Sequence, residues 1–175
     1  RRGMILYFAC QSLPLYFMDK QNFRIIKSDN SGWSSICEDL SDLPVFMRSV
    51  WLDAVCTKWS VNTIYTNDNQ ILGAVIFQQG KKFGIQTILN PHMTPYHGLW
   101  INEVLFKHKK EHKTIYKVIS SLLIDSLPKA GYINLRLSPS VRDIQEFKWR
   151  GYDAHVRYTY KIPSTTNMEE LWTSL

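Results

Sequence analysis

The sequence has few of the residues that hold small secreted domains together or that bind metals in sets. Its 175 residues include three cysteines, Cys10, Cys37 and Cys56, and no C-x-x-C pair. An odd number of widely spaced cysteines indicates reduced, mostly buried thiols in a reducing compartment, and not a disulfide framework. N-x-S/T sequons are absent as well. We therefore expect a cytoplasmic protein.

A long apolar run is also lacking. Two arginines precede the apolar stretch Ile5–Cys10, as in a secretory signal, but polar residues and a proline interrupt it within residues 11–14. No small-x-small cleavage site follows, and the stretch is far shorter than the ~20 apolar residues of a membrane-spanning helix. We interpret residues 1–18 as an N-terminal extension, either non-native or disordered, with a secretory signal as the alternative, and we expect no stable membrane span.

Charge of one sign does not dominate. The net charge is +6, and part of this excess is local, in four lysines and two histidines of residues 107–113. A nucleic-acid interface would interleave its basic residues with aromatic ones on one face, which this run does not do. Apolar residues at 45% and charged residues at 21% are an ordinary balance for one globular domain.

Strong catalytic signatures are missing too. There is no G-x-S-x-G elbow, and Cys37 and Cys56 lie in apolar helical patterns that favour burial over nucleophilic attack. His108–His112 matches the zinc signature H-x-x-E-H, but the neighbouring lysines repel a dication and no third ligand follows, so we interpret it as a loop-to-helix junction. The glycine-containing stretch 79–84 leads into a strand and not a helix, so it predicts a hairpin turn and not a phosphate loop.

What is present predicts a mixed α/β domain of the α+β kind, with a largely antiparallel sheet. In residues 61–89, β-branched and aromatic segments alternate with turn residues, which predicts a three-strand meander with a turn at Gly80-Lys81-Lys82. Its strands are predicted at Val61–Thr66, Ile71–Gln79 and Phe83–Leu89.

Around the meander we expect helices and further strands. A short strand at Phe23–Lys27 precedes a helix over Trp33–Leu40 with Ser31 as its N-cap, and a second helix ends at Thr57, with Val50, Trp51, Ala54 and Val55 as its apolar stripe. A helix over Glu111–Lys129 has apolar residues at helical spacing, with Ser120 on its outer face. The remaining predictions are a strand at Tyr132–Leu137, a helix at Val141–Lys148 capped by Ser138 or Ser140, a long strand at Tyr152–Ile162 and a last helix from about Asn167.

Two segments contain candidate binding residues. The loop Asn90–Trp100 contains two prolines, a glycine, two histidines and two aromatics, a composition typical of functional loops, although a purely structural connection is the alternative. From it we select Thr94, Tyr96, His97 and Trp100. On the predicted final strand, Arg157 could pair with an anionic ligand or with a surface carboxylate, and Tyr158 lies beside it.

Three stretches resemble motifs of FemAB-like proteins of the GNAT superfamily, which include the BioF2-like acetyltransferase domain. They are residues 43–56, the segment from Thr94 to Ile101 and the segment from Gly151 to Tyr160. The likeness extends from about Phe23 to Leu175 and depends on the order and spacing of the motifs. It implies a GNAT-like central sheet at residues 19–165 and a helix at 166–175 that leads to a second, C-terminal lobe absent from this sequence.

The resemblance also implies a function. FemAB-like enzymes transfer an acyl or aminoacyl group to an amine, so the donor would be acyl-CoA or aminoacyl-tRNA and no metal would be needed. The acceptor would be a cell-wall precursor or another small molecule, bound by Thr94, Tyr96, His97, Trp100, Arg157 and Tyr158 in an acceptor-side lobe. Catalytic residues cannot be named, and the Q/R-x-x-G-x-G/A loop that binds the CoA pyrophosphate in GNAT enzymes is absent. A non-catalytic binding or interaction module is therefore the alternative.

Overall fold

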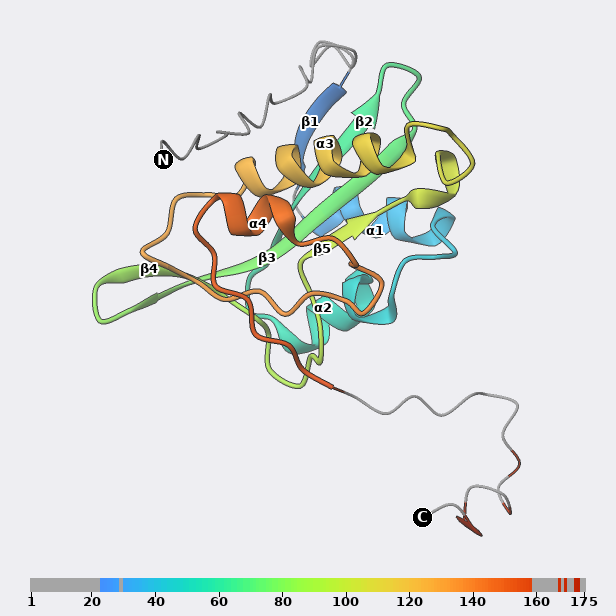
Figure 1. Cartoon of the computed structure of the whole chain (residues 1–175). Coiled ribbons are helices and arrows are strands. Elements are labelled where there is room, and N and C mark those ends of the chain that lie inside the picture. Colours follow the sequence, from blue (N-terminus) through green and yellow to red (C-terminus); the bar gives the residue numbers. More distant parts are fainter. Residues whose placement is uncertain (1–22, 29, 159–166, 168, 170–171, 174–175) are drawn as a thin grey trace, which may run out of the picture.

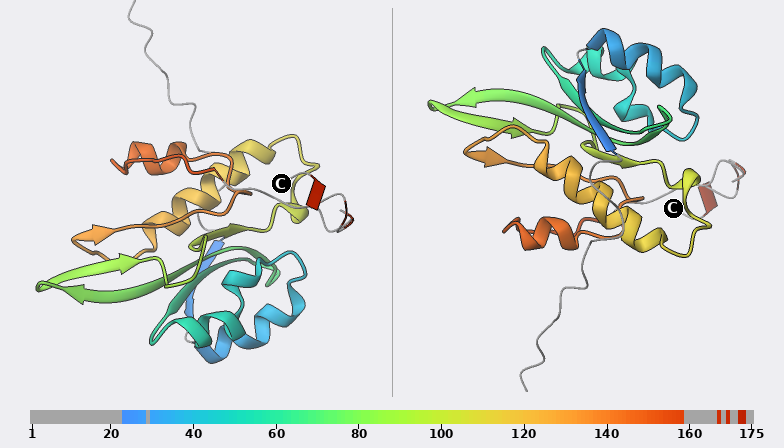
Figure 2. Two further views of the ribbon diagram at one scale, coloured as in Figure 1. Left: turned by 90° about the horizontal axis from the view of Figure 1, so that it is seen from below. Right: turned by 90° about the horizontal axis from the view of Figure 1, so that it is seen from above.

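The protein folds as a mixed sheet covered by helices on both faces. The computed structural model describes residues 23–28, 30–158, 167, 169 and 172–173. Helices α1 (Asn30–Asp39) and α2 (Ser49–Val55) cover one face of the sheet, and α3 (His112–Asp125) and α4 (Gln145–Trp149) cover the other (Figure 1). The three layers are clearest in the views from above and below (Figure 2).

The sheet runs in the order β1-β2-β3-β4-β6, and β5 also pairs with β3. The pairings of β1 with β2, of β2 with β3, and of β3 with both β4 and β5 are antiparallel, whereas β4 and β6 pair in parallel. The strands are β1 (Phe23–Ser28), β2 (Ser60–Thr66), β3 (Ile71–Lys82), β4 (Ile85–Leu89), β5 (Leu99–Ile101) and β6 (Tyr132–Ile133). This arrangement confirms the α+β prediction with a largely antiparallel sheet.

Strands β4 and β5 lie one after the other along the same side of the long strand β3. Gln78–Lys82 of β3 pair with β4, and Gly73–Val75 pair with β5. Between these pairings the chain leaves the sheet in the loop 90–98 and returns where the N–H of Ile76 donates to the carbonyl oxygen of Gly98, at 2.9 Å. The predicted loop Asn90–Trp100 therefore connects β4 to β5, which both pair with β3, and its last two residues belong to β5.

Each face of the sheet has its own hydrophobic core. The core under α1 and α2 includes Trp33, Met47 and Trp59, and the core under α3 includes Ile64, Ile119 and Leu123. Gly73 lets α3 approach closely, since a Cβ there would stand 3.1 Å from Leu123 Cδ1 and 3.2 Å from Ile119 Cγ2. Cys37 and Cys56 are buried free thiols, as predicted, and burial raises the pKa of Cys56 to about 11. Cys10 lies outside the described residues.

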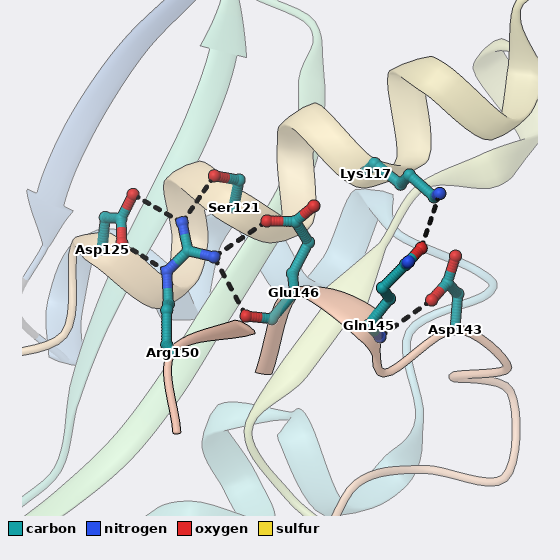
Figure 3. A network of polar contacts seen from close by, with 7 residues as sticks. All are labelled: Lys117, Ser121, Asp125, Asp143, Gln145, Glu146 and Arg150. Carbon is teal, nitrogen blue, oxygen red and sulfur yellow. Dashed lines mark hydrogen bonds and ion pairs between the residues drawn. The ribbon is translucent and has the colours of Figure 1, made fainter. Parts of the chain in front are cut away.

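Helix α4 is fastened to α3 mainly by the polar contacts of Arg150, and Lys117 Nζ on α3 also donates to Gln145 Oε1 on α4 at 2.7 Å (Figure 3). Arg150 Nε and Nη2 donate to the two carboxylate oxygens of Asp125 at 2.7 and 2.8 Å. Its Nη2 also donates to Ser121 Oγ at 2.7 Å, and its Nη1 donates to a Glu146 carboxylate oxygen at 2.8 Å. Hydrogen bonds to Asp125 raise the pKa of Arg150. The guanidinium therefore stays charged and ties two consecutive helices together.

Two local predictions about the first helices and the hairpin are wrong. In α2 the predicted apolar stripe is wrong at Val50, which is 83% exposed, and at the exposed Ala54, whereas Val55 does pack against the core. The buried residues of the helix are Ser49 and Leu52. The β3–β4 turn lies at Phe83-Gly84, which both have positive φ, and not at Gly80-Lys81-Lys82, which belong to β3.

The predicted helix caps also fail. Helix α1 begins at Asn30, before Ser31. Helix α4 begins at Gln145, whose N–H donates to Asp143 Oδ1, whereas Ser138 and Ser140 bond to each other in the preceding loop. Ser120 is buried on α3 and does not face outward.

The predicted long strand at Tyr152–Ile162 is wrong for the residues that can be placed. Residues 152–158 have no regular secondary structure, and His155, Val156, Arg157 and Tyr158 are exposed, because none of the strands that the structure describes pairs with this segment. The rest of that prediction, at 159–162, lies outside the described residues, as does the predicted extension 1–18. Of the predicted last helix, Glu169, Trp172 and Thr173 are helical.

Candidate functional site

A cavity of about 390 Å³ opens where two neighbouring segments of the sheet separate. Along β4 and β6 the backbones are joined, and Asn134 N–H donates to the carbonyl oxygen of Ile88 at 2.8 Å. Among the described residues, the last such link joins the N–H of His97 to the carbonyl oxygen of Arg136 at 2.6 Å. After it, β5 pairs with β3, and the cavity is lined by residues of β5 and by Ser138, Ser140 and Val141 of the chain that leads to α4.

The cavity wall combines aromatic, carboxylate and hydroxyl groups. Its aromatic residues are Tyr96, Trp100 and Tyr116, and its carboxylates are Asp42 and Glu103. The other lining residues are Pro44, Ile101, Asn102, Val104, Ser138, Ser140 and Val141. Among the residues that the structure describes, no Lys, Arg or His lines this cavity. A cavity of this size suits a small ligand, since such sites are mostly apolar with a few well-placed polar groups.

Tyr116 lies on this wall, and its pKa reflects both burial and nearby negative charges. Burial, together with the negative charges of Glu103 and Asp143, raises the pKa of Tyr116 to about 12. The phenol therefore stays protonated and keeps an O–H that can donate a hydrogen bond to a ligand.

Glu103 also contacts a histidine outside the cavity. His112 Nε2 and Glu103 Oε2 are 2.9 Å apart, and the imidazole also packs against the ring of Phe106. His112 is the second histidine of the H-x-x-E-H match, and its partner Glu103 lies outside that motif. Among the described residues, no group of three or more His, Cys, Asp or Glu is placed to hold a metal ion.

The loop 90–98 is held in shape by its own polar groups. Asn90 Nδ2 donates to the carbonyl oxygen of Thr94, and Thr94 Oγ1 donates to the carbonyl oxygen of His92 at 3.0 Å. The indole N–H of Trp51 donates to Thr94 Oγ1 at 3.1 Å and ties the loop to α2. Thr94 thus organises the loop from a buried position.

Tyr96 and Trp100 are the predicted binding residues that reach the cavity. Tyr96 packs edge-to-face on Phe46, with ring centroids 5.0 Å apart, which orients its ring. Trp100, on β5, is buried and also belongs to the core under α1 and α2. Two aromatic residues of the predicted loop, four apart in the sequence, therefore line the cavity.

His97 lies at the point where the two segments separate. It is fully buried, and neither ring nitrogen has a hydrogen-bond partner among the described residues. Burial lowers its pKa to about 4, so the imidazole is neutral at physiological pH. Its side chain is not part of the cavity wall.

Arg157 and Tyr158 are not brought to the cavity in the part of the chain that the structure describes. Both are exposed, Tyr158 to 95%, on the irregular segment 152–158. Their role in binding stays a prediction without support from the geometry.

Sequence reasoning missed most of the polar wall. Asp42, Glu103, Tyr116 and Ser138 come from four separate parts of the chain, and none belongs to a recognisable motif.

No protein-family model matches the sequence, and no curated protein matches it either. Solved structures do resemble the fold. A ribosomal-protein-alanine N-acetyltransferase from Brucella melitensis biovar Abortus 2308 has a TM-score of 0.42 at 11% identity, over 81% of this chain and 98% of that one. An acetyltransferase from Trypanosoma brucei has a TM-score of 0.39 at 13% identity, over 81% and 99%. Values this low do not assign an activity to this chain.

No helix among the described residues has the length and apolar character needed to cross a bilayer.

Proposed function

We propose that the protein is an N-acyltransferase of the GNAT type, which transfers an acyl group from acyl-CoA to an amine bound in the cavity beside β5. The observation that carries the proposal is the cavity itself, which opens where paired segments of the sheet separate and which lies next to the start of α3. The α+β fold that the resemblance to GNAT proteins led us to expect supports it.

The region before α3 supports an anionic donor. Lys107, Lys109 and Lys110 are exposed in the turn that leads from β5 to α3. A helix N-terminus favours negative charge because its first N–H groups have no partner within the helix. The lysines would add positive point charges for the phosphates of acyl-CoA.

The proposed reaction needs little covalent chemistry from the protein. The amine nitrogen attacks the thioester carbonyl carbon, a C–N bond forms, the C–S bond breaks, and CoA leaves as the thiol with the proton that the amine loses. Asp42 and Glu103 are the lining carboxylates that can accept a proton from an incoming ammonium group. Holding the amine beside the donor supplies much of the rate.

A second candidate is a non-catalytic binding module, and one observation favours it. Backbone N–H groups of the turn before α3 bond within the turn: Lys107 donates to the carbonyl oxygen of Glu103 at 2.7 Å and Lys109 to that of Phe106 at 2.9 Å. These two amides are therefore not free for a pyrophosphate, in keeping with the missing Q/R-x-x-G-x-G/A loop.

The more specific features of FemAB-like enzymes remain predictions. They are aminoacyl-tRNA as donor, a cell-wall precursor as acceptor, and an acceptor-side lobe at 19–165 that is completed by a second lobe.

Calorimetry with acetyl-CoA distinguishes the two candidates. The acyltransferase proposal predicts micromolar binding, and it predicts that Lys109→Ala/Lys110→Ala weakens this binding by about tenfold, which is about 1.4 kcal/mol. The matched control Lys81→Ala/Lys82→Ala removes two exposed lysines from β3 and should leave the affinity unchanged. Absence of acetyl-CoA binding, or equal losses in the two double variants, would favour the binding module.

A further inference from the structure

The charge of the cavity wall restricts the kind of molecule that can occupy it. Asp42 and Glu103 line the cavity, and among the described residues no cationic side chain does. A ligand carboxylate or phosphate placed there would lie near two carboxylates and would have no cationic lining side chain to pair with. This arrangement costs free energy because like charges at close range repel.

A second observation supports a negative potential inside the cavity. The pKa of Tyr116 is raised by burial and, in addition, by the charges of Glu103 and Asp143. The pKa of this phenol is thus affected by two carboxylates from different segments, Glu103 in the turn before α3 and Asp143 before α4. A cation bound at this wall would be stabilised by the same charges.

The aromatic rings offer a further contact for a cation. Tyr96, Trp100 and Tyr116 all line the cavity. Ammonium groups are attracted to the faces of aromatic rings, most strongly to indole, and this attraction is larger at sites shielded from water. Trp100 and Tyr116 are both largely buried, so little water surrounds these two lining residues.

We infer that the cavity selects a cationic aliphatic amine that has no carboxylate, of the diamine or polyamine kind. The two wall carboxylates would neutralise the ammonium groups, and the rings together with Ile101 and Val141 would contact the methylene chain. An amino acid is disfavoured because no cationic side chain among the described lining residues could pair with its carboxylate. This inference rests on the proposed function in one respect, since it assigns the cavity to the acceptor of the transfer.

Calorimetry without a donor tests the inference with three probes of similar length. Putrescine carries two ammonium groups, ornithine adds a carboxylate, and butanediol carries no charge. We expect putrescine to bind, ornithine to bind at least about tenfold more weakly, and butanediol to give no binding heat. Ornithine binding as tightly as putrescine, or absence of putrescine binding, overturns the inference.

Variants test whether the binding occurs in this cavity. Glu103→Gln keeps a side-chain oxygen for His112 and removes one charge, and Asp42→Asn removes the other; each should weaken putrescine binding by about tenfold or more. Asp68→Asn, at an exposed turn between β2 and β3, removes the same charge outside the cavity and should have no effect. Circular dichroism confirms that each variant is folded. An equal effect of all three variants overturns the inference, because putrescine binding would then depend on the net charge of the protein and not on the carboxylates of the cavity.

The two proposals fail separately. If acetyl-CoA binds but putrescine does not, the amine class is wrong and the acyltransferase proposal stands. If putrescine binds with the expected selectivity but acetyl-CoA does not bind, the cavity still selects cationic amines and the acyltransferase proposal is wrong.

Discussion

His97 is notable among the single residues because its imidazole is buried without a hydrogen-bond partner, next to the point where the cavity begins. A neutral imidazole can occupy such a place, but an imidazolium cannot do so without a large desolvation cost. The lowered pKa of about 4 expresses this cost. The residue therefore makes the region around the loop 90–98 sensitive to acid.

This sensitivity gives the first prediction. Because the folded-state pKa of His97 lies below the unfolded value, the unfolded chain binds more protons between the two. The stability that His97 contributes is present above pH 6.5 and is lost as the pH falls toward 4, by about 3 kcal/mol in total. Urea unfolding of the wild type at several pH values should show this loss.

The variant His97→Leu should remove that part of the pH dependence, whereas His155→Leu, at an exposed position, should retain it. An identical pH profile for the wild type and His97→Leu would contradict the account, because the imidazole would then titrate normally.

Single residues also show the limit of sequence reasoning about the site. Tyr96 and Trp100 were selected because they share a short, unusual loop whose composition differs from that of its surroundings. Glu103, Tyr116 and Ser138 gave no such signal, because each belongs to a different element and only folding brings them together. Arg157 was selected from an alternating pattern that, in the structure, has no strand to support it.

At the level of secondary-structure elements, the contact between α3 and α4 supports one side of the cavity. The loop that contains Ser138, Ser140 and Val141 runs directly into α4, and α4 is held on α3 by Arg150. This fastening limits how far the loop can move away from β5.

Replacing Arg150 by lysine should loosen the fastening. A lysine has one charged nitrogen and cannot reach Asp125, Ser121 and Glu146 with the planar geometry of a guanidinium. The expected destabilisation is about 1 kcal/mol, a modest value because Asp125 is largely exposed to water. Urea unfolding measures it, with hydrogen exchange of the α4 amides as a local readout.

The exposed Arg142→Lys is the matched control and should leave both readouts unchanged. If Arg150→Lys proved as stable as the wild type with unchanged exchange in α4, the arginine would not be what holds the helix.

The elements differ in how well the sequence predicted them. The meander was predicted because its strands have β-branched residues and its turns have polar ones, which are local signals. The exact turn was missed because Phe83 adopts positive φ, an arrangement that β-propensity disfavours. The buried face of α2 was misjudged because apolar Val50 lies on the exposed side, and the side that contacts the sheet is set by tertiary packing.

At the level of the whole molecule, the sheet is continuous on one side and divided on the other. Helices cover both faces of the sheet (Figure 2). The segments that separate beside the cavity are linked at one end by the bond from the His97 N–H to the carbonyl oxygen of Arg136. The cavity combines residues from the turn after α1, the loop 90–98, β5, α3 and the chain before α4. A cavity that depends on so many segments requires the whole fold, and this is why no short motif could predict it.

The most direct test of the account measures acyl transfer with the cavity open and with it filled. The protein is incubated with acetyl-CoA and a panel of primary amines, and the N-acetyl product and released CoA are quantified by mass spectrometry. Val141→Phe places a ring in the cavity wall, and Val156→Phe, on the exposed segment after α4, is the matched control. We predict that the wild type and Val156→Phe form product, whereas Val141→Phe forms at least about tenfold less and binds acetyl-CoA with unchanged affinity. Equal product from Val141→Phe and the wild type, or no product with any amine, would contradict the account.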